Sequence, residues 1–568
     1  MTYRLLGPVF ACLVVLVAGC APGAQNPRTD GPSATSSAPK ILRMGIRAGD
    51  EPQTASGGIA YNNEEPGLIF HSALVAYDPT TSVLETRIAE RVPTVENGDW
   101  RLSPDGTMEV TWKMRPNVLW HDGTPLEAGD FVFGLKVGMD GDVFARATGV
   151  LRSISDITAP DPQTLVVKWK NVYIYANAMV KDTLVPAPRH LFQDLYDSGD
   201  KRALAASPYW TTQFTGVGPY RLEQWIQGSS MEAVAYDQYF LGRPKIDRIS
   251  IRYVGDVNTL LVTVMAGDVD VVPGGAFKQE EGHVLKTEWE ARGSGTVLVN
   301  YMDLRHGKPI WRYPDAPWVQ DVRVRQALVH MLDRQGMVDT LKYGLSAVAD
   351  VPLLPENPAY RLAQQRGLPS YPYDVTRAQR LLTEAGYTRG ADGIFRSQSG
   401  ERFTIEAAAT ADIASQVQEL VVIADHWRAG GLDATSFPVP DLSADKDELR
   451  SKARGIVVKG LDLDYTGFQE FTVAETSSEA TRWKGRNLGA YVNPAYDQQV
   501  SRLLAAVQGS EREQAGADLI KMALEEVVWI PLFYGADIVA ARTGIRGVTK
   551  AIPAQDITSW NVHLWDIQ

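Results

Sequence analysis

The chain has 568 residues, 44% of them hydrophobic and 22% charged, which is the composition of a globular protein too long for one hydrophobic core. Its formal net charge is -12 at pH 7 and no basic cluster offsets it, so binding to nucleic acid or to anionic lipid headgroups is disfavoured. We therefore expect two or three lobes and no nucleic acid among the partners.

The N-terminus is typical of a cleaved export signal. An apolar stretch from Leu5 to Val17 follows Arg4, and it is too short to span a bilayer as a permanent helix. Cys20 comes directly after small residues, in a run that resembles a bacterial lipobox. We predict that residues 1–19 are a lipoprotein signal peptide and that Cys20 is lipidated, which would tether the protein to the outer face of a membrane. The alternative is an ordinary signal peptide with an incidental cysteine.

Residues 20–39 are predicted to be a flexible linker. They are rich in Ala, Pro, Gly, Ser and Thr, and they have no apolar period that could form a core. The only cysteine besides Cys20 is Cys12, which lies inside the presumed signal peptide. The mature body is therefore expected to have no disulfide and no cysteine-ligated metal or cluster.

From Lys40 onward, strand patterns alternate with helix patterns. Short apolar or alternating runs predict strands at 41–46, 108–114, 165–169 and 249–253. Apolar residues at helical spacing predict helices that begin near Asp130, Asp321 and Asp374, and a further one with a stripe from Val417 to Trp427. Asp321 and Asp374 stand where N-caps are expected, and Gly386 stands where a helix ends. No stretch repeats at a fixed period, so a mixed α/β architecture is predicted.

The segment from Leu102 to Phe133 holds the most informative motif. A Pro-Asp-Gly turn and an alternating strand lead into Trp120-His121-Asp122-Gly123-Thr124-Pro125 and then into an apolar helix. This segment resembles the signature of the extracellular solute-binding proteins of family 5, the peptide and nickel binders that feed ABC transporters. We interpret His121 and Asp122 as structural, with Asp122 bonding local backbone N–H groups. The alternative is a catalytic pair.

The resemblance extends from about Ile41 to the C-terminus in blocks that keep the family's order. The further blocks are Gly216–Leu222, Asp237–Phe240, Asp321–Arg334, Tyr373–Tyr387 and Asn493–Asp497. The family implies an α/β, two-lobed periplasmic-binding-protein-like fold of type II, with an extra subdomain in lobe I. Transferred to this chain, lobe I would be 40–296 with the extra subdomain at about 52–205, lobe II would be 297–532, and 533–568 would return to lobe I.

The resemblance also implies a place for the ligand. Peptide binders of the family hold the ligand's amino group with an aspartate in a block that reads roughly Trp, two residues, Asp-Tyr. Here Asp464 and Tyr465 match its end, while Leu461 replaces the tryptophan and Thr466-Gly467-Phe468 replaces the usual continuation. Asp464 would meet an ammonium group, because a buried carboxylate needs such a partner. The alternatives are a hinge or surface carboxylate for Asp464 and a packing role for Tyr465.

Two further ligand-binding residues are expected just past the first strand. Asp50 and Glu51 stand where family members expose backbone to the ligand. A plain loop is the alternative interpretation of this segment.

The family implies a lipid-anchored, extracytoplasmic solute-binding protein. It would capture an oligopeptide or similar solute between its lobes and deliver it to the permease subunits of an ABC importer. We expect a monomer that needs no cofactor and meets the membrane only through its lipid anchor. The alternatives are a binder of oligosaccharide or metal chelate on the same scaffold and, less favoured, a secreted hydrolase.

No enzymatic activity is predicted. The sequence has no His-Glu-x-x-His helix, no Gly-x-Ser-x-Gly elbow and no phosphate loop, and its eight histidines lack metal-ligand spacing. Neither a catalytic residue nor a metal ligand is therefore assigned.

Overall fold

The computed structural model describes residues 38–52, 58, 65–79, 81–144, 149–180, 184–411, 414–440, 445–553 and 555–568. Lys40–Gln568 forms one contact unit, while the predicted signal peptide, Cys20 and the linker as far as residue 37 lie outside the described residues. Within the described part, no helix combines the length and the apolarity needed to cross a membrane.

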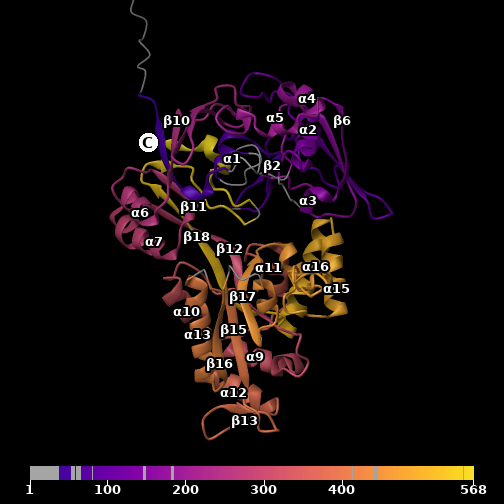
Figure 1. Cartoon of the computed structure of the whole chain (residues 1–568), viewed down its shortest axis with the longest axis vertical. Coiled ribbons are helices and arrows are strands. Elements are labelled where there is room, and N and C mark those ends of the chain that lie inside the picture. Colours follow the sequence, from indigo (N-terminus) through magenta and orange to yellow (C-terminus); the bar gives the residue numbers. More distant parts are fainter. Residues whose placement is uncertain are drawn as a thin grey trace, which may run out of the picture. The chain divides into compact units, whose positions relative to one another are not determined.

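One ten-stranded sheet runs through the whole unit, in the order β16-β15-β17-β12-β18-β11-β1-β10-β9-β8. Its strands are β1 (Ile41–Arg47), β8 (Tyr220–Ile226), β9 (Ser230–Ala235), β10 (Arg248–Val254), β11 (Val271–Phe277), β12 (Gly295–Pro309), β15 (Thr404–Thr410), β16 (Asp433–Val439), β17 (Gly455–Asp462) and β18 (Ile530–Arg542). The two central strands, β12 and β18, are antiparallel and the longest, with 15 and 13 residues. Figure 1 shows them running from the group around β10 and β11 to the group around β15, β16 and β17. They join two lobes.

The first lobe is built on the parallel pair β1 and β10, flanked by β11 and by the β8–β9 hairpin. Leu42, Met44 and Ile46 of β1 are buried, as alternating apolar residues in a central strand should be. The helices of this lobe are α1 (Glu65–Phe70), α2 (Ala128–Met139), α3 (Gly149–Arg152), α4 (Arg189–Asp197), α5 (Lys201–Ala205), α6 (Val257–Met265) and α7 (Gln279–Val284). The strands predicted at 41–46 and 249–253 are thereby confirmed.

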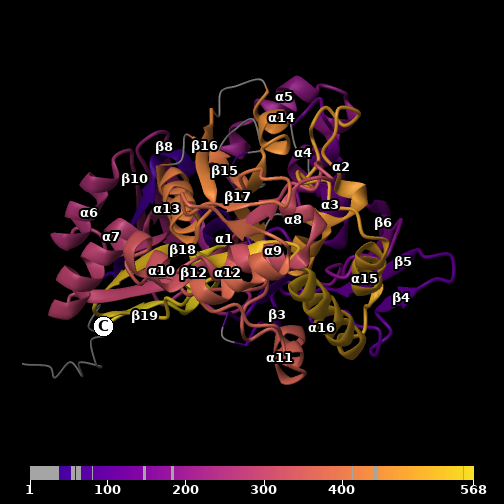
Figure 2. The same ribbon diagram turned by 90° about the horizontal axis from the view of Figure 1, so that it is seen from below.

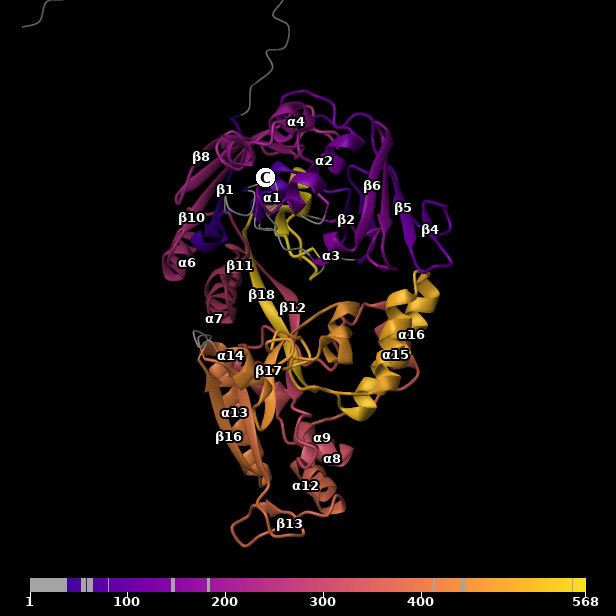
Figure 3. The ribbon, with the colours of Figure 1, turned by 45° about the vertical axis from the view of Figure 1, so that its right-hand side comes forward.

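A second sheet of four strands stands apart from the large one. It consists of β4 (Trp100–Leu102), β5 (Met108–Lys113), β7 (Thr164–Trp169) and β6 (Ile154–Asp161), in that order, and Figure 3 shows it beside α2. Trp112 of β5 and Phe131 of α2 share one buried cluster. The strands predicted at 108–114 and 165–169 and the helix near Asp130 are confirmed. A short hairpin, β2 (Val75–Tyr77) with β3 (Leu84–Thr86), packs against the same cluster.

Two segments of the sequence motif meet inside this lobe. The ring of His121 accepts a hydrogen bond from Gly216 N at 3.1 Å on Nδ1 and donates from Nε2 to Gly218 O at 3.0 Å. Asp122 accepts a hydrogen bond from Thr124 N at 2.9 Å and a second contact from His190 at 2.8 Å. The structural interpretation of His121 and Asp122 therefore agrees with the observed contacts, because His121 joins the turn to the block Gly216–Leu222 and Asp122 bonds within the turn and to His190.

The second lobe carries helices on both faces of β15, β16 and β17. They are α8 (Pro317–Gln320), α9 (Val322–His330), α10 (Arg334–Leu341), α11 (Pro358–Gln365), α12 (Val375–Glu384), α13 (Ala414–Gly430), α14 (Lys446–Ser451), α15 (Pro494–Ala505) and α16 (Gly509–Glu526). One buried cluster joins α9, α12 and α13 to the sheet, and another joins α11, α15 and α16. Figure 2 shows α15 and α16 side by side, away from α13.

The predicted helix ends of the second lobe are confirmed. Asp321 accepts a hydrogen bond from Arg323 N at 2.8 Å, and Asp374 accepts one from Arg377 N at 2.8 Å, so both are N-caps. Gly386 follows α12 with a φ of +93°, a conformation that favours glycine. Two small two-stranded sheets complete the fold, the hairpin of β13 (Thr388–Arg389) with β14 (Phe395–Arg396) and the antiparallel pair of β19 (Ile545–Arg546) with β20 (Asp566–Ile567).

The predicted lobe boundaries fall inside the shared strands. Positions 296–297 lie in β12 and positions 532–533 lie in β18. Both strands belong to both lobes, so the exact boundaries and the limits of the extra subdomain stay predictions.

Three histidines of the first lobe should make the protein less stable below about pH 6.5. Burial lowers the pKa of His71 and His563 to about 4 and that of His121 to about 3. The unfolded chain takes up these protons near its ordinary pKa and the folded chain does not, so the free energy of unfolding falls as the pH drops from about 6.5 toward 4. Each histidine contributes a slope of about 1.4 kcal/mol per pH unit within that window.

Urea unfolding curves between about pH 7.5 and about pH 4.5 measure this effect. His121→Gln is the comparison variant, because glutamine can keep a hydrogen bond at this position and does not titrate. The stability difference between parent and variant should move in favour of the variant as the pH falls. A difference that stays constant over the range would contradict the prediction.

Candidate functional site

A cavity of about 450 Å³ lies beside Asp464 and takes its walls from both lobes. The first lobe contributes Tyr77, the segment Ser82–Leu84 and Val92 on one side, and Tyr175 with Ile174 and Asn177 on another. The second lobe contributes the loop before α11, the segment Leu463–Tyr465 and the start of α16. This volume falls within the range of small-molecule sites.

Asp464 is held at the edge of the cavity by the short helix η6 (Tyr465–Phe471), of which it is the N-cap. Its Oδ1 accepts hydrogen bonds from Thr466 N at 2.7 Å and from Thr466 Oγ1 at 2.5 Å. Both bonds reach the same oxygen, and the backbone N–H of Gly467 also bonds to the carboxylate. Burial raises the pKa of Asp464, and the hydrogen bonds from Thr466 oppose that rise. A cation entering the cavity would offset the cost of burying this charge.

Tyr465 lines the same cavity but is fixed by the protein itself. Its backbone N–H donates to Tyr175 Oη at 3.1 Å, and its own hydroxyl donates to Asn357 Oδ1 at 3.1 Å. The side chain is 8% exposed, so it serves packing as well as lining the wall. The bond to Tyr175 ties the Asp464 segment to the first lobe. Ile174, next to Tyr175, strengthens this link because it packs into a buried cluster of the second lobe.

Asp50 and Glu51 do not line the Asp464 cavity. Asp50 ends the short helix Ala48–Asp50 and forms an ion pair with Arg47 at 3.0 Å. Glu51 accepts hydrogen bonds from Trp225 Nε1 at 2.7 Å and from Gly228 N at 2.8 Å, so it holds the β8–β9 hairpin. The structure thus brings together two of the four expected ligand residues, Asp464 and Tyr465, and places the other two elsewhere in the first lobe.

A second polar cavity, of about 360 Å³, lies along β12 and β18. Glu419 lines it and accepts hydrogen bonds from Arg305 at 2.7 Å and from Lys342 at 2.8 Å, so these cations are neutralised inside the protein. Asp303 and Asp537 also line it, and burial is the main cause that raises the pKa of each. In the sequence, Asp303 and Asp537 could have been recognised as charged residues inside otherwise apolar strands.

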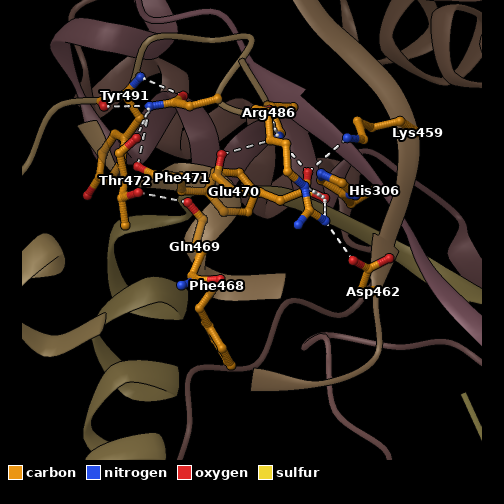
Figure 4. A network of polar contacts seen from close by, with 12 residues as sticks. His306, Lys459, Asp462, Phe468, Gln469, Glu470, Phe471, Thr472, Arg486 and Tyr491 are labelled. Carbon is orange, nitrogen blue, oxygen red and sulfur yellow. Dashed lines mark hydrogen bonds and ion pairs between the residues drawn. The ribbon is translucent and has the colours of Figure 1, made fainter. Parts of the chain in front are cut away.

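Glu470 anchors the helix that Asp464 caps. Its side chain is 3% exposed, and its carboxylate contacts Lys308 at 3.0 Å, Lys459 at 2.8 Å and Arg486 at 2.5 Å. Figure 4 shows Arg486 bridging Glu470 and Asp462 in this network. Burial alone would raise the pKa of Glu470, but the three positive charges outweigh it and hold the pKa below its usual range. Glu470 therefore stays ionised and ties η6 to β12 and β17.

The described residues contain no candidate metal site. There, no group of three or more His, Cys, Asp or Glu side chains is arranged to hold a metal ion. The chemistry available at the Asp464 cavity is that of three carboxylates, one guanidinium, tyrosine hydroxyls and amide groups.

Two α/β lobes joined by two long strands, with a ligand-sized cavity walled by both, are the architecture of a two-lobed solute-binding protein. The family model described as bacterial extracellular solute-binding proteins, family 5 middle, matches residues 92–481. The chain belongs to this family. The resemblance seen in the segment Leu102–Phe133 is confirmed.

Known proteins match over most of the chain. The oligopeptide-binding protein AppA of Bacillus subtilis is 25% identical over 372 residues, which are 63% of this chain and 64% of AppA. The chain likewise spans 64% of the length of the curated Brucella relatives that it matches.

Solved structures confirm the predicted two-lobed periplasmic-binding-protein-like fold. NikZ of Campylobacter jejuni, solved in complex with Ni(L-His), has a TM-score of 0.65 at 21% identity and covers 92% of this chain and 99% of its own. AppA of Bacillus subtilis, solved in complex with a nonapeptide, has a TM-score of 0.61 at 19% identity and covers 94% of this chain and 100% of its own. At these identities the likeness concerns the fold.

Glu470→Gln should lower the free energy of unfolding by about 3 kcal/mol or more, because it leaves the buried Lys308 without its counter-charge. Asp462→Asn is the matched control. Asp462 contacts the same Arg486 at 2.6 Å, but its side chain is 60% exposed, so its loss should stay below about 1 kcal/mol. Urea denaturation of both variants measures the difference. Equal losses would show that Glu470 does not anchor η6 in this way.

Proposed function

We propose that this protein binds a peptide or a similar small solute between its lobes and delivers it to the permease of an ABC importer. The observation that carries the proposal is the Asp464 cavity, whose walls come from both lobes. A ligand held there contacts both lobes at once, so ligand binding can favour a closed arrangement of the two. The relationship to AppA, which is named as an oligopeptide-binding protein, supports a peptide as the solute.

In this proposal Asp464 binds an ammonium group of the solute. Its carboxylate is largely shielded from water, and Tyr77, Tyr175 and Tyr465 line the space around it. In such surroundings the carboxylate can accept a strong, charge-assisted hydrogen bond from an N–H⁺ group. Aromatic faces add attraction for a cation. Tyr465 contributes its ring and no hydroxyl, since that hydroxyl is bonded to Asn357.

The remaining features of the proposal concern the whole protein. It acts as a monomer on the extracytoplasmic face of the membrane, is anchored by a lipid on Cys20 and catalyses no reaction. Its lobes are 40–296 with 533–568 and 297–532, and the extra subdomain at about 52–205 brings Tyr77 and Tyr175 to the cavity. Asp50 and Glu51 do not line the Asp464 cavity, and their side chains are engaged with Arg47, Trp225 and Gly228, so a contact of this segment with the solute would be made by its backbone.

A sugar is the second candidate solute. The tyrosine-rich wall of the cavity favours it, because flat aromatic faces and hydroxyl groups suit a carbohydrate. Asp464 is the residue that distinguishes the two, since a neutral sugar offers it no positive charge.

Calorimetry with pooled peptides and pooled oligosaccharides tests the proposal on the mature protein. Peptides should bind, and Asp464→Asn should weaken their binding at least tenfold, because a hydrogen bond to a charged group contributes about 1.5–3 kcal/mol. Asp462→Asn, the same change two residues earlier on an exposed side chain, should leave affinity unchanged. Binding of sugars alone would refute the peptide assignment, and an Asp464→Asn variant as tight as the parent would remove Asp464 from the site.

Mass spectrometry of the protein isolated from membranes tests the anchor. The N-terminal residue should be Cys20 carrying a diacylglycerol, and Cys20→Ala should release the protein into the soluble fraction, because a single folded body without its lipid has no other hold on the bilayer. An unmodified chain that begins elsewhere would show that the segment is an ordinary signal peptide.

A further inference from the structure

A third cavity, here called the distal cavity, lies in the second lobe away from Asp464. It measures about 360 Å³ and is formed by the loop that leads into α8, the loop between β14 and β15, and Arg454 just before β17. Asp464 follows the other end of β17, and a strand of eight residues spans about 23 Å. Figure 1 shows β13, the partner of β14, at the end of the second lobe that is remote from the first. A ligand in the distal cavity would therefore not touch a solute at Asp464.

Aromatic rings form the apolar part of the distal cavity. Its lining includes Tyr313, Trp318, Tyr387 and Phe403. Trp318 and Phe403 are buried and belong to the core of the lobe, whereas the two tyrosines are only partly buried. The guanidinium of Arg454 lies 4.4 Å from the ring centroid of Tyr313, and the rings of Tyr387 and Phe403 are 5.3 Å apart. Both tyrosines are thus fixed by neighbours, and rigid flat rings of this kind suit stacking against a ring-shaped ligand.

Polar groups of both signs surround the same space. Asp315 and Glu401 are acidic and Arg402 and Arg454 are basic, so the formal charges of the lining cancel. Arg402 is paired outside the cavity, with Asp433 at 3.1 Å. Among the residues that the structure describes, Asp315, Glu401 and Arg454 form no ion pair and no side-chain hydrogen bond. Two carboxylates that accept and one guanidinium that donates are therefore free to bind hydroxyl groups.

The charge balance decides between classes of ligand. A site for an anion or for a cation is lined by an excess of the opposite charge, and the distal cavity has no excess of either sign. An apolar ligand would strip water from the charged groups and offer them no hydrogen bond in return. A sugar ring avoids both problems, because it is neutral, carries hydroxyl groups around its edge and has a flat C–H face.

We propose that the distal cavity is a second binding site, which holds one neutral sugar ring of a mono- or oligosaccharide. The C–H face of the ring stacks on a tyrosine, Glu401 accepts hydrogen bonds from its hydroxyl groups, and Arg454 donates to a hydroxyl oxygen. The volume is near the lower end of the range of small-molecule sites, which suits a single ring. The site does not depend on the proposed function, because none of its lining residues lines the Asp464 cavity.

A panel of neutral mono- and disaccharides tests this site by ligand-observed NMR and calorimetry on the mature protein. At least one sugar should bind to the parent. Glu401→Ala and Arg454→Met should each weaken its binding about tenfold, as expected for the loss of one hydrogen bond to a charged group. Glu384→Ala and Arg380→Met are the matched controls. Both residues are exposed on α12 and lie outside the cavity, so these variants should bind the sugar as the parent does.

Two further variants separate the distal cavity from the cavity between the lobes. Asp464→Asn should leave sugar binding unchanged, and peptides should not compete with the sugar. Tyr387→Leu keeps an apolar side chain but removes the flat ring, so it should weaken sugar binding several-fold, and thermal melting shows whether it is folded. The assignment is wrong if no sugar of the panel binds, if Glu401→Ala and Arg454→Met bind it as tightly as the parent, or if Asp464→Asn abolishes the binding.

Discussion

Antiparallel pairing of β12 with β18 fixes the positions of all other elements that reach the cavity. The pair runs from Gly295 opposite Arg542 to Gly307 opposite Ile530, with two register shifts in β12. In the sheet, β11 and β1 follow on the side of β18, and β17 and β15 follow on the side of β12. Both lobes are thus extensions of one sheet, and a change in the register of this pair would move one lobe's side chains relative to the other's.

Asp303 shows how tightly the central strands are fitted. It lies on β12 between the two neighbouring strands, and a Cβ added at Gly460 or at Gly535 would come within 2.0 Å or 1.9 Å of its carboxylate oxygens. Glycine at both positions leaves the room that the Asp303 side chain needs. Gly460 belongs to β17, which ends at Asp462, two residues before Asp464.

Local patterns predicted the elements, and the family resemblance pointed to two residues that line the cavity. The N-caps Asp321 and Asp374 and the strand Met108–Lys113 were predictable because their signals lie within a few residues of each other in the chain. Asp464 and Tyr465 were predicted from the family block alone. Asp50 and Glu51 were placed at a ligand because they follow the first strand, yet the partners of Glu51 come from the hairpin around Gly228, which no local pattern reveals.

The Glu470 network could not be predicted from the sequence for a similar reason. The partners of Glu470 are Lys308, Lys459 and Arg486, and two of them belong to β12 and β17. Only the sheet order brings these cations to one carboxylate.

Glu470 and Asp464 differ in their partners, and this difference indicates that Glu470 is the carboxylate that stabilises the fold. Both belong to the segment of η6 and both are shielded from water, but Glu470 is surrounded by three positive charges, whereas Asp464 receives neutral donors from Thr466 and Gly467. A buried carboxylate without a counter-charge destabilises the fold unless a cation arrives from outside. The protein compensates Glu470 within its own chain, and it leaves the compensation of Asp464 to whatever enters the cavity.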